Sequence, residues 1–191
     1  MRFRPPLRAS VTRRGEKQQK LRDFVIDRIP GARADTAPAR ELLLVARSVE
    51  SPVVKAVAGL AREIASNGLS VRMIVARADK ESLPQGWSFA DPAAAFTHEI
   101  RWARNPRLIE AHEQLVLGAE TCWIGDSMRR DPSKCDAFEN YVEACPQTAG
   151  AAAVSFERLW TVSEPLLIEG ARPPGDTAGF GRPAFDVATR H

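Results

Sequence analysis

The feature that most constrains the fold is a strand–helix–strand pattern between residues 41 and 76. Residues 42–46, Leu-Leu-Leu-Val-Ala, form a short continuous apolar run that is typical of a strand buried on both faces. Ser51-Pro52 predicts a helix start, because a capping hydroxyl precedes a proline at the first helical position. Asn67-Gly68 predicts the helix end, and residues 69–76 predict a second strand. Such a unit implies two parallel strands with a right-handed crossover, and therefore an α/β domain.

The rest of the chain predicts further elements around this unit. Strands are expected at 97–102, 114–117 and 121–124, and helices at 16–29, 137–144 and 149–162, with one helical turn at Asn105-Pro106. We expect residues 1–15 to be irregular. We also expect the glycine- and proline-rich chain from Glu169 onward to be disordered. The predicted organisation is a basic arm with a short helix (1–40), a folded domain (41–168) and a disordered tail (169–191).

The cysteines and the apolar runs exclude several classes of protein. Three cysteines, Cys122, Cys135 and Cys145, give an odd count without a tight framework, which argues against a disulfide-stapled secreted domain. No C-x-x-C or H-x-x-x-H spacing occurs, so we expect no metal site and no cofactor. No apolar run approaches the ~18 residues of a membrane span, and the N-terminus has no apolar secretory core. These features favour a cytoplasmic protein.

The positive charge is concentrated at the N-terminus. Residues 1–22 carry eight basic residues against one acidic residue, a net charge of +7, whereas the other 169 carry 19 basic and 23 acidic residues, a net charge of −4. An arm of this kind attracts nucleic acid, anionic lipid or an acidic protein, and the alternative is a solvated tail with no specific partner. The basic residues of the arm are Arg2, Arg4, Arg8, Arg13, Arg14, Lys17, Lys20 and Arg22.

A histidine stands at the mouth of a predicted hairpin. His112-Glu113-Gln114 leads into the apolar residues 115–117, a glycine turn at Gly118 and a second apolar strand that ends at Gly125. A single histidine before a strand is most often a surface or hydrogen-bonded structural residue. The hairpin around His112 makes a catalytic origin equally plausible.

Three segments in this order resemble the phospholipase D superfamily. They are a helix that ends at Gly68 and leads into a valine-containing strand, the hairpin from His112 to Gly125, and a C-terminal helix with Phe156 and Leu159-Trp160. The resemblance covers about residues 41–165 and implies one half of a two-lobed enzyme. The implied fold is a single α/β half-domain whose mixed, mostly parallel sheet is flanked by helices. Members of the family with one half usually form homodimers in which the two histidines meet, so we expect a homodimer.

The family motif is H-x-K, four residues, then D, with a Gly-Ser and an Asn downstream. His112 matches the histidine, Gln114 stands at the lysine position, and Gly118 stands at the aspartate position with one residue fewer in the strand. Gly125 matches the glycine, and Asp126-Ser127-Met128 replaces the serine and asparagine region. The resemblance therefore implies a degenerate form of the motif.

The chemistry of the family explains why these replacements matter. One histidine attacks phosphorus, a second protonates the leaving oxygen, and two lysines neutralise the charge that builds in the transition state. Glutamine donates a hydrogen bond but carries no charge. Beside His112, the candidate residues are Gln114 and Ser127 at the motif, Arg129, Arg130 and Lys134 for phosphate or another anion, and Asn140 and Glu143 as a supporting pair on a predicted helix. His98 is a weaker candidate, and His191 belongs to the tail.

Three hypotheses follow. The first is a catalytically degenerate domain, not an active enzyme, that binds an anionic partner such as nucleic acid. The second is an active, metal-independent phosphodiesterase or nuclease that uses His112 from two subunits and keeps its activity in the presence of chelators. The third is a structural or assembly subunit without affinity for nucleic acid.

Overall fold

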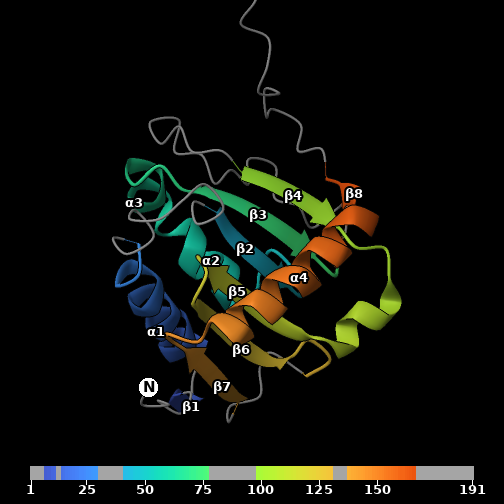
Figure 1. Ribbon diagram of the computed structural model, residues 1–191. Helices are drawn as coiled ribbons and strands as arrows, with labels where there is room; N and C mark the ends of the chain where they lie inside the picture. The colour runs from blue at the N-terminus through green and yellow to red at the C-terminus, as the bar shows by residue number, and fades with distance from the viewer. Residues whose placement is uncertain (1–6, 12–13, 30–40, 78–97, 131–136, 167–191) are drawn as a thin grey trace, which may run out of the picture.

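A single mixed β-sheet forms the centre of the molecule. The structure is a computed structural model that describes residues 7–11, 14–29, 41–77, 98–130 and 137–166. Its strands are β1 (Leu7–Val11), β2 (Glu41–Ala46), β3 (Ser70–Val75), β4 (His98–Trp102), β5 (His112–Leu117), β6 (Thr121–Ser127), β7 (Ala137–Val142) and β8 (Glu164–Pro165). Its helices are α1 (Arg14–Ile26), α2 (Pro52–Ala58), α3 (Ala61–Ser66), the 3-10 helix η3 (Pro106–Glu110) and α4 (Pro146–Val162). The eight strands lie in the order β1-β7-β6-β5-β2-β3-β4-β8 (Figure 1).

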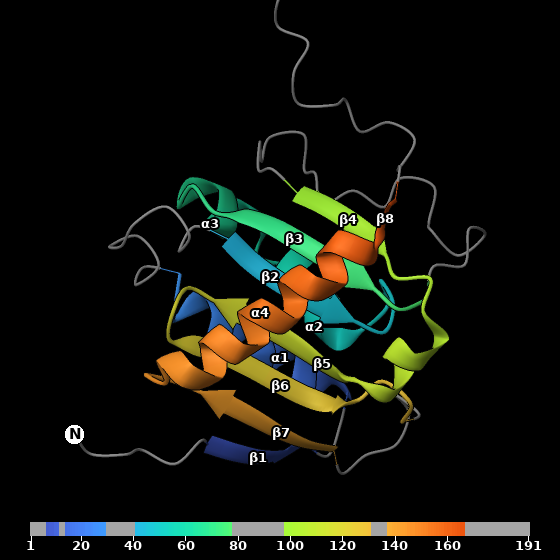
Figure 2. The ribbon, with the colours of Figure 1, turned by 45° about the vertical axis from the view of Figure 1, so that its right-hand side comes forward.

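Helices cover both faces of this sheet. Figure 1 and Figure 2 show α1, α2 and α3 on one face and α4 running diagonally across the other. Alternate residues of β2 enter the two hydrophobic cores: Leu42 and Leu44 pack on the α1–α2 side, and Leu43 and Val45 on the α4 side. This double burial explains why β2 is a continuous apolar run and not an alternating one. No helix within the described segments is long and apolar enough to span a bilayer.

The predicted strand–helix–strand unit is confirmed. β2 pairs with β3 in parallel, and β3 pairs with β4 in parallel. Gly68 adopts φ +67° immediately after the helix, a conformation that glycine reaches without the steric cost of a side chain. The crossover helix differs in one respect: it is split into α2 and α3 at Gly59-Leu60. Glycine has a low helix propensity, and the amide of Leu60 bonds to Val57 instead of continuing the α-helical ladder.

The sheet is mixed, as predicted, but most of its strand pairs are antiparallel and not parallel. Among the described strands only the β2–β3 and β3–β4 pairs are parallel, and the remaining pairs are antiparallel. The reason is the β5–β6–β7 meander, whose short turn at Gly118 (φ +65°) allows only antiparallel neighbours. The expectation of a mostly parallel sheet is therefore wrong.

The predicted helix at residues 137–144 is also wrong, because this segment forms strand β7. It pairs with β6 on one side and with β1 on the other. Glu139 and Tyr141 are buried on the α1 side of the sheet, whereas Asn140 is half-buried. A charged residue at a buried position interrupts the apolar/polar alternation that indicates a strand. The cation that pairs with Glu139 lies far away in the sequence, so the local pattern does not show that Glu139 is buried.

The N-terminal segment belongs to the folded domain. Leu7–Val11, expected to be irregular, forms edge strand β1 against β7, and the predicted helix is confirmed as α1. Leu21 and Phe24 of α1 are buried in the same core as the sheet, and the Phe24 ring meets Tyr141 edge-on at 5.1 Å between centroids. The expectation that the folded body begins at Glu41 is therefore wrong, and the predicted tail at 169–191 lies outside the described residues.

The C-terminal helix α4 seals the second core. It begins at Pro146, three positions before the predicted Ala149, and buries Phe156 and Trp160 against the sheet. The guanidinium of Arg72, from β3, lies 4.3 Å from the centroid of the Trp160 ring and bonds to both carboxylate oxygens of Glu157 at 2.6 and 3.0 Å. This arginine joins α4 to the sheet by stacking and by a paired hydrogen bond.

Candidate functional site: the sheet edge at His112

The candidate site lies at one edge of the sheet, where the carboxyl ends of β2, β3 and β4 meet the start of β5. Because β5 runs antiparallel to β2, the register of Val45 with Gln114 brings His112 to the end of β2. The last residue of β6, Ser127, stands opposite His112. Open α/β sheets bind their ligands beyond the carboxyl ends of the strands, so the edge is the expected position for a site.

His112 is exposed, and its ring is oriented by the backbone. Its Nδ1 lies 2.8 Å from the carbonyl oxygen of Gly125. A carbonyl oxygen can only accept, so Nδ1 is the donor and the neutral ring has its lone pair on Nε2. The register shifts between His112 and Gln114, because β6 has an extra residue there. This bulge turns the Gly125 carbonyl toward the histidine.

Gly125 has a packing reason in this chain. A Cβ at this position would lie 2.6 Å from Cζ2 of Trp123, whose indole is fully buried against it. Real Cβ atoms essentially never approach other atoms so closely. The glycine that resembles the glycine of the family motif is therefore required by the neighbouring tryptophan.

Gln114, which the sequence aligns with the motif lysine, faces α4. Its side chain is half-buried, and its Nε2 donates to the carbonyl oxygen of Ala152 at 3.4 Å. The amide is thus engaged with the helix backbone and carries no charge. It therefore does not supply a cation at the histidine.

Sequence reasoning missed the buried charge network directly beneath the site. Glu113 points to the α1 side, where one oxygen accepts from the amide of Arg47 at 3.1 Å and the other lies 3.8 Å from the Lys17 ammonium. The same ammonium lies 2.7 Å from Glu139, which is fully buried and accepts from the hydroxyl of Tyr141 at 3.0 Å. Burial, and then the charge of Glu139 and its hydrogen bond, raise the pKa of Tyr141.

This network corrects the expectation for Lys17, which was assigned to the nucleic-acid arm. Its side chain is only 13% exposed, and its Nζ also lies 5.2 Å from the Trp123 ring centroid. No local sequence pattern reveals that Lys17 is buried, because the carboxylates that it contacts come from β5 and β7. Of the other arm residues, Lys20 and Arg22 are exposed on α1.

Two of the remaining arm residues belong to regular elements of the fold. Arg8 lies in β1 and Arg14 begins α1, whereas Arg2, Arg4 and Arg13 lie outside the described residues.

The two predicted anion-binding arginines lie just after β6 and differ in how strongly a carboxylate already holds each guanidinium. Arg130 bonds to the Asp126 carboxylate at 2.7 Å, and its carbonyl oxygen accepts from Arg47 at 2.9 Å. Arg129 is 75% exposed and lies 3.6 Å from the exposed carboxylate of Glu110. A pair so exposed is weak, so Arg129 is the more available cation. Lys134 lies outside the described residues.

The hydroxyl of Ser127 is committed to local backbone contacts. Its Oγ lies 3.4 Å from the carbonyl oxygen of Glu110 and 3.3 Å from the amide of Arg129. Asp126 in turn accepts from the Ser127 amide at 2.8 Å. These bonds fix the turn after β6, so the side chain of Ser127 holds the loop that carries Arg129.

Asn140 and Glu143 do not form the predicted supporting pair. Asn140 lies in strand β7 and Glu143 follows the end of that strand, so the helical spacing of three does not apply. Glu143 instead forms an ion pair with Arg28 of α1. His98 begins β4, His191 lies outside the described residues, and within the described residues no group of three or more His, Cys, Asp or Glu is placed to hold a metal ion.

Comparison with known proteins identifies the fold. No protein-family model matches the sequence, and no curated protein matches it in sequence. Among solved structures, Nuc of Salmonella typhimurium, a phospholipase D family member, has a TM-score of 0.51 at 13% identity, with 85% of this chain and 99% of Nuc covered. NucT of Helicobacter pylori has a TM-score of 0.51 at 10% identity, with 85% and 100% covered.

A third similar structure is larger than this chain. TrmBL2, an archaeal chromatin protein with a novel mode of DNA binding, has a TM-score of 0.51 at 13% identity. The match covers 85% of this chain but only 55% of TrmBL2, so the chain spans about half the length of that protein. At these identities the likeness concerns the fold alone, and the chain has the α/β fold of the phospholipase D superfamily.

Proposed function

We propose that this chain is a catalytically degenerate phospholipase D-like domain that binds nucleic acid at the edge carrying His112. The observation that carries the proposal is the state of Gln114. It replaces the lysine of the motif, and its amide bonds to the carbonyl oxygen of Ala152. In a homodimer that joins two such edges, both copies would lack this cation. Loss of one preorganised charge-stabilising donor costs about 2.7–4 kcal/mol of transition-state stabilisation, so two losses would make hydrolysis very slow.

Affinity for an anion does not need the missing lysine. Arg129 is an exposed cation beside Ser127, and Lys20 and Arg22 add positive charge on the surface of α1. Phosphate contacts of this kind supply most of the sequence-independent affinity for nucleic acid. Similar folds occur in TrmBL2, whose mode of DNA binding has been described, and in the phospholipase D family member Nuc.

The test is a titration of fluorescently labelled DNA followed by anisotropy at several salt concentrations. We expect the affinity to fall with rising salt, and Arg129→Ala to reduce the logarithmic slope by about 0.9 for duplex DNA. Arg158→Ala, which removes an exposed arginine from α4, is the matched control and should leave the slope unchanged. No binding even at low salt would contradict the proposal and favour the third hypothesis, a structural or assembly subunit.

A second candidate function is metal-independent phosphodiester hydrolysis by a homodimer. One observation favours it: the bond from Nδ1 of His112 to the Gly125 carbonyl leaves Nε2 with its lone pair on an exposed ring. In the neutral ring, this is the tautomer that a nucleophilic Nε2 needs. This function predicts cleavage that survives chelators and disappears in His112→Ala.

A further inference from the structure

A second candidate site lies on the same sheet edge, beyond β3 and β4. It is a cavity of about 510 Å³ that is widely open to solvent, and its volume lies within the range of about 300–1,000 Å³ seen for small-ligand sites. Its lining comes from the end of β4, from the residues that follow β3 and β4, and from η3: Ala76, Arg77, Trp102, Ala103, Arg104, Asn105, Pro106 and Ile109. None of these residues belongs to the motif around His112.

The charge at this cavity is positive. Arg77 is exposed and forms no ion pair with any residue that the structure describes. Arg104 lies 3.0 Å from Glu164, but both side chains are more than half exposed, so water and salt screen the pair. Two arginines thus line the cavity, and only a screened, exposed pair with Glu164 engages one of them. An anionic group can take the place of Glu164 at Arg104 and can bind Arg77 directly.

Apart from Asn105, the rest of the lining is apolar and partly aromatic. The guanidinium of Arg104 lies 4.9 Å from the centroid of the Trp102 ring, and alanine, proline and isoleucine side chains complete the wall. Free phosphate needs no such surface. A ligand that uses both parts of the cavity has a flat apolar body joined to an anionic group, which is the chemistry of a nucleotide.

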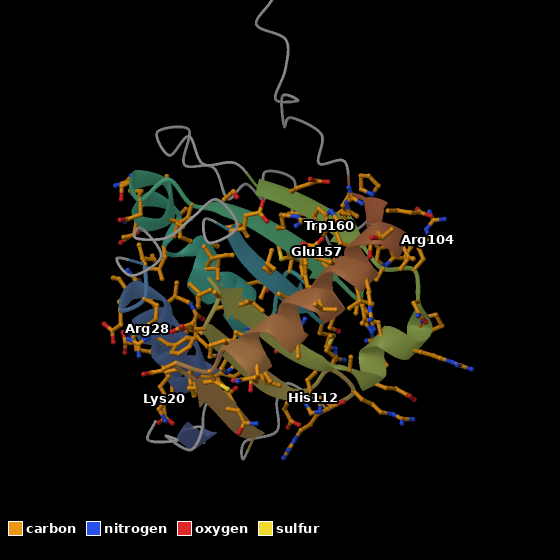
Figure 3. All side chains as sticks on the ribbon, viewed as in Figure 1. Lys20, Arg28, Arg104, His112, Glu157 and Trp160 are labelled. Carbon is orange, nitrogen blue, oxygen red and sulfur yellow. The ribbon has the colours of Figure 1, made fainter. Side chains whose placement is uncertain are left out.

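We propose that this cavity binds one nucleotide of a single-stranded nucleic acid. Its base would pack against Trp102 and the Arg104 guanidinium, and its phosphate would bind Arg77. The inference rests on the proposed function and deepens it, because a base paired in a duplex cannot enter a cavity without first leaving the stack. The short helix η3 connects the cavity to the first site, since Ile109 lines the cavity and Ala111 precedes His112 (Figure 3). One strand could therefore contact both sites.

The experiment compares a labelled oligothymidine, a duplex of equal length and free thymidine monophosphate. The double variant Arg77→Ala/Arg104→Ala should bind the single strand about tenfold more weakly or worse, and its salt slope should fall by about 0.7 for the one phosphate that Arg77 binds. Trp102→Leu, checked for folding by circular dichroism, should weaken single-strand binding and leave the slope unchanged. Arg158→Ala is the control and should behave as wild type.

The outcomes separate this inference from the proposed function. If wild type binds DNA but the double variant binds equally well, or if duplex is preferred, the cavity is not a nucleotide site, although the proposed function stands. If wild type binds no DNA, the proposed function fails, and thermal shift with thymidine monophosphate decides the cavity. Stabilisation of wild type but not of the double variant would support a mononucleotide site, and no stabilisation would overturn it.

Discussion

Lys17→Met should strongly destabilise the folded protein, although it removes little more than one ammonium group. Lys17 lies 2.7 Å from Glu139 and 3.8 Å from Glu113, and the three side chains are 13%, 0% and 9% exposed. Methionine keeps most of the apolar stem but removes the only ammonium that these two carboxylates contact among the described residues. It therefore leaves buried negative charge without a cationic partner.

The magnitude follows from this burial. Removal of one partner from a buried ion pair costs about 3–5 kcal/mol, compared with a total stability of about 5–15 kcal/mol for a typical domain. With a urea m-value of about 2 kcal/mol/M, the unfolding midpoint should fall by about 1.5–2.5 M. Lys20→Met, on the same helix but exposed, should change the stability by no more than about 0.5 kcal/mol.

The assay is urea unfolding followed by tryptophan fluorescence and by circular dichroism. Glu139→Gln keeps an acceptor for the Tyr141 hydroxyl but removes the charge, so it closes a double-mutant cycle with Lys17→Met. The double variant should be more stable than Lys17→Met alone. Equal effects of Lys17→Met and Lys20→Met, or strict additivity in the cycle, would refute the reasoning.

Three further predictions follow from single groups. Gly125→Ala should destabilise by about 1–3 kcal/mol because its new methyl would meet a buried indole, whereas Gly150→Ala in the open interior of α4 should stabilise by about 0.5–1 kcal/mol, both measured by urea unfolding. Because the pKa of Tyr141 is raised in the folded protein, its neutral hydroxyl contributes to the free energy of unfolding. This contribution is fully present below the unfolded pKa of about 10 and is lost as the pH rises through the folded pKa. Tyr141→Phe should therefore flatten the loss of stability above about pH 10. Burial raises the pKa of Cys122 to about 11, whereas the hydrogen bond with Thr148 lowers that of Cys145, so iodoacetamide at neutral pH should label Cys145 well before Cys122, as read by peptide mass mapping.

The elements that could be predicted from the sequence are those whose signals are local. The apolar run of β2, the proline start of α2 and the glycine after α3 each lie within a few residues, and each agrees with the structure. Strand β7 was missed because its buried Glu139 looks like a surface residue. The charge that offsets this burial comes from Lys17 in α1, far away in the sequence.

In the candidate site, too, only the features with a local signal could be predicted from the sequence. The position of His112 at the head of a hairpin is visible in the sequence, since the strand and the glycine turn adjoin it. The role of Glu113 is not visible, because its partners come from α1 and from the end of β2. The cavity beyond β4 is equally hidden, because Arg77 and Arg104 line one cavity only through the parallel pairing that brings two distant strand ends together.

The most direct test of the central claim is hydrolysis of a generic phosphodiester and of labelled DNA, with a chelator present, by wild type and His112→Ala in parallel. The account predicts no cleavage by either protein, because Gln114 contributes no charge at the histidine. Cleavage by wild type that disappears in His112→Ala, with a phosphohistidine trapped on His112 during turnover, would contradict it and establish the second function.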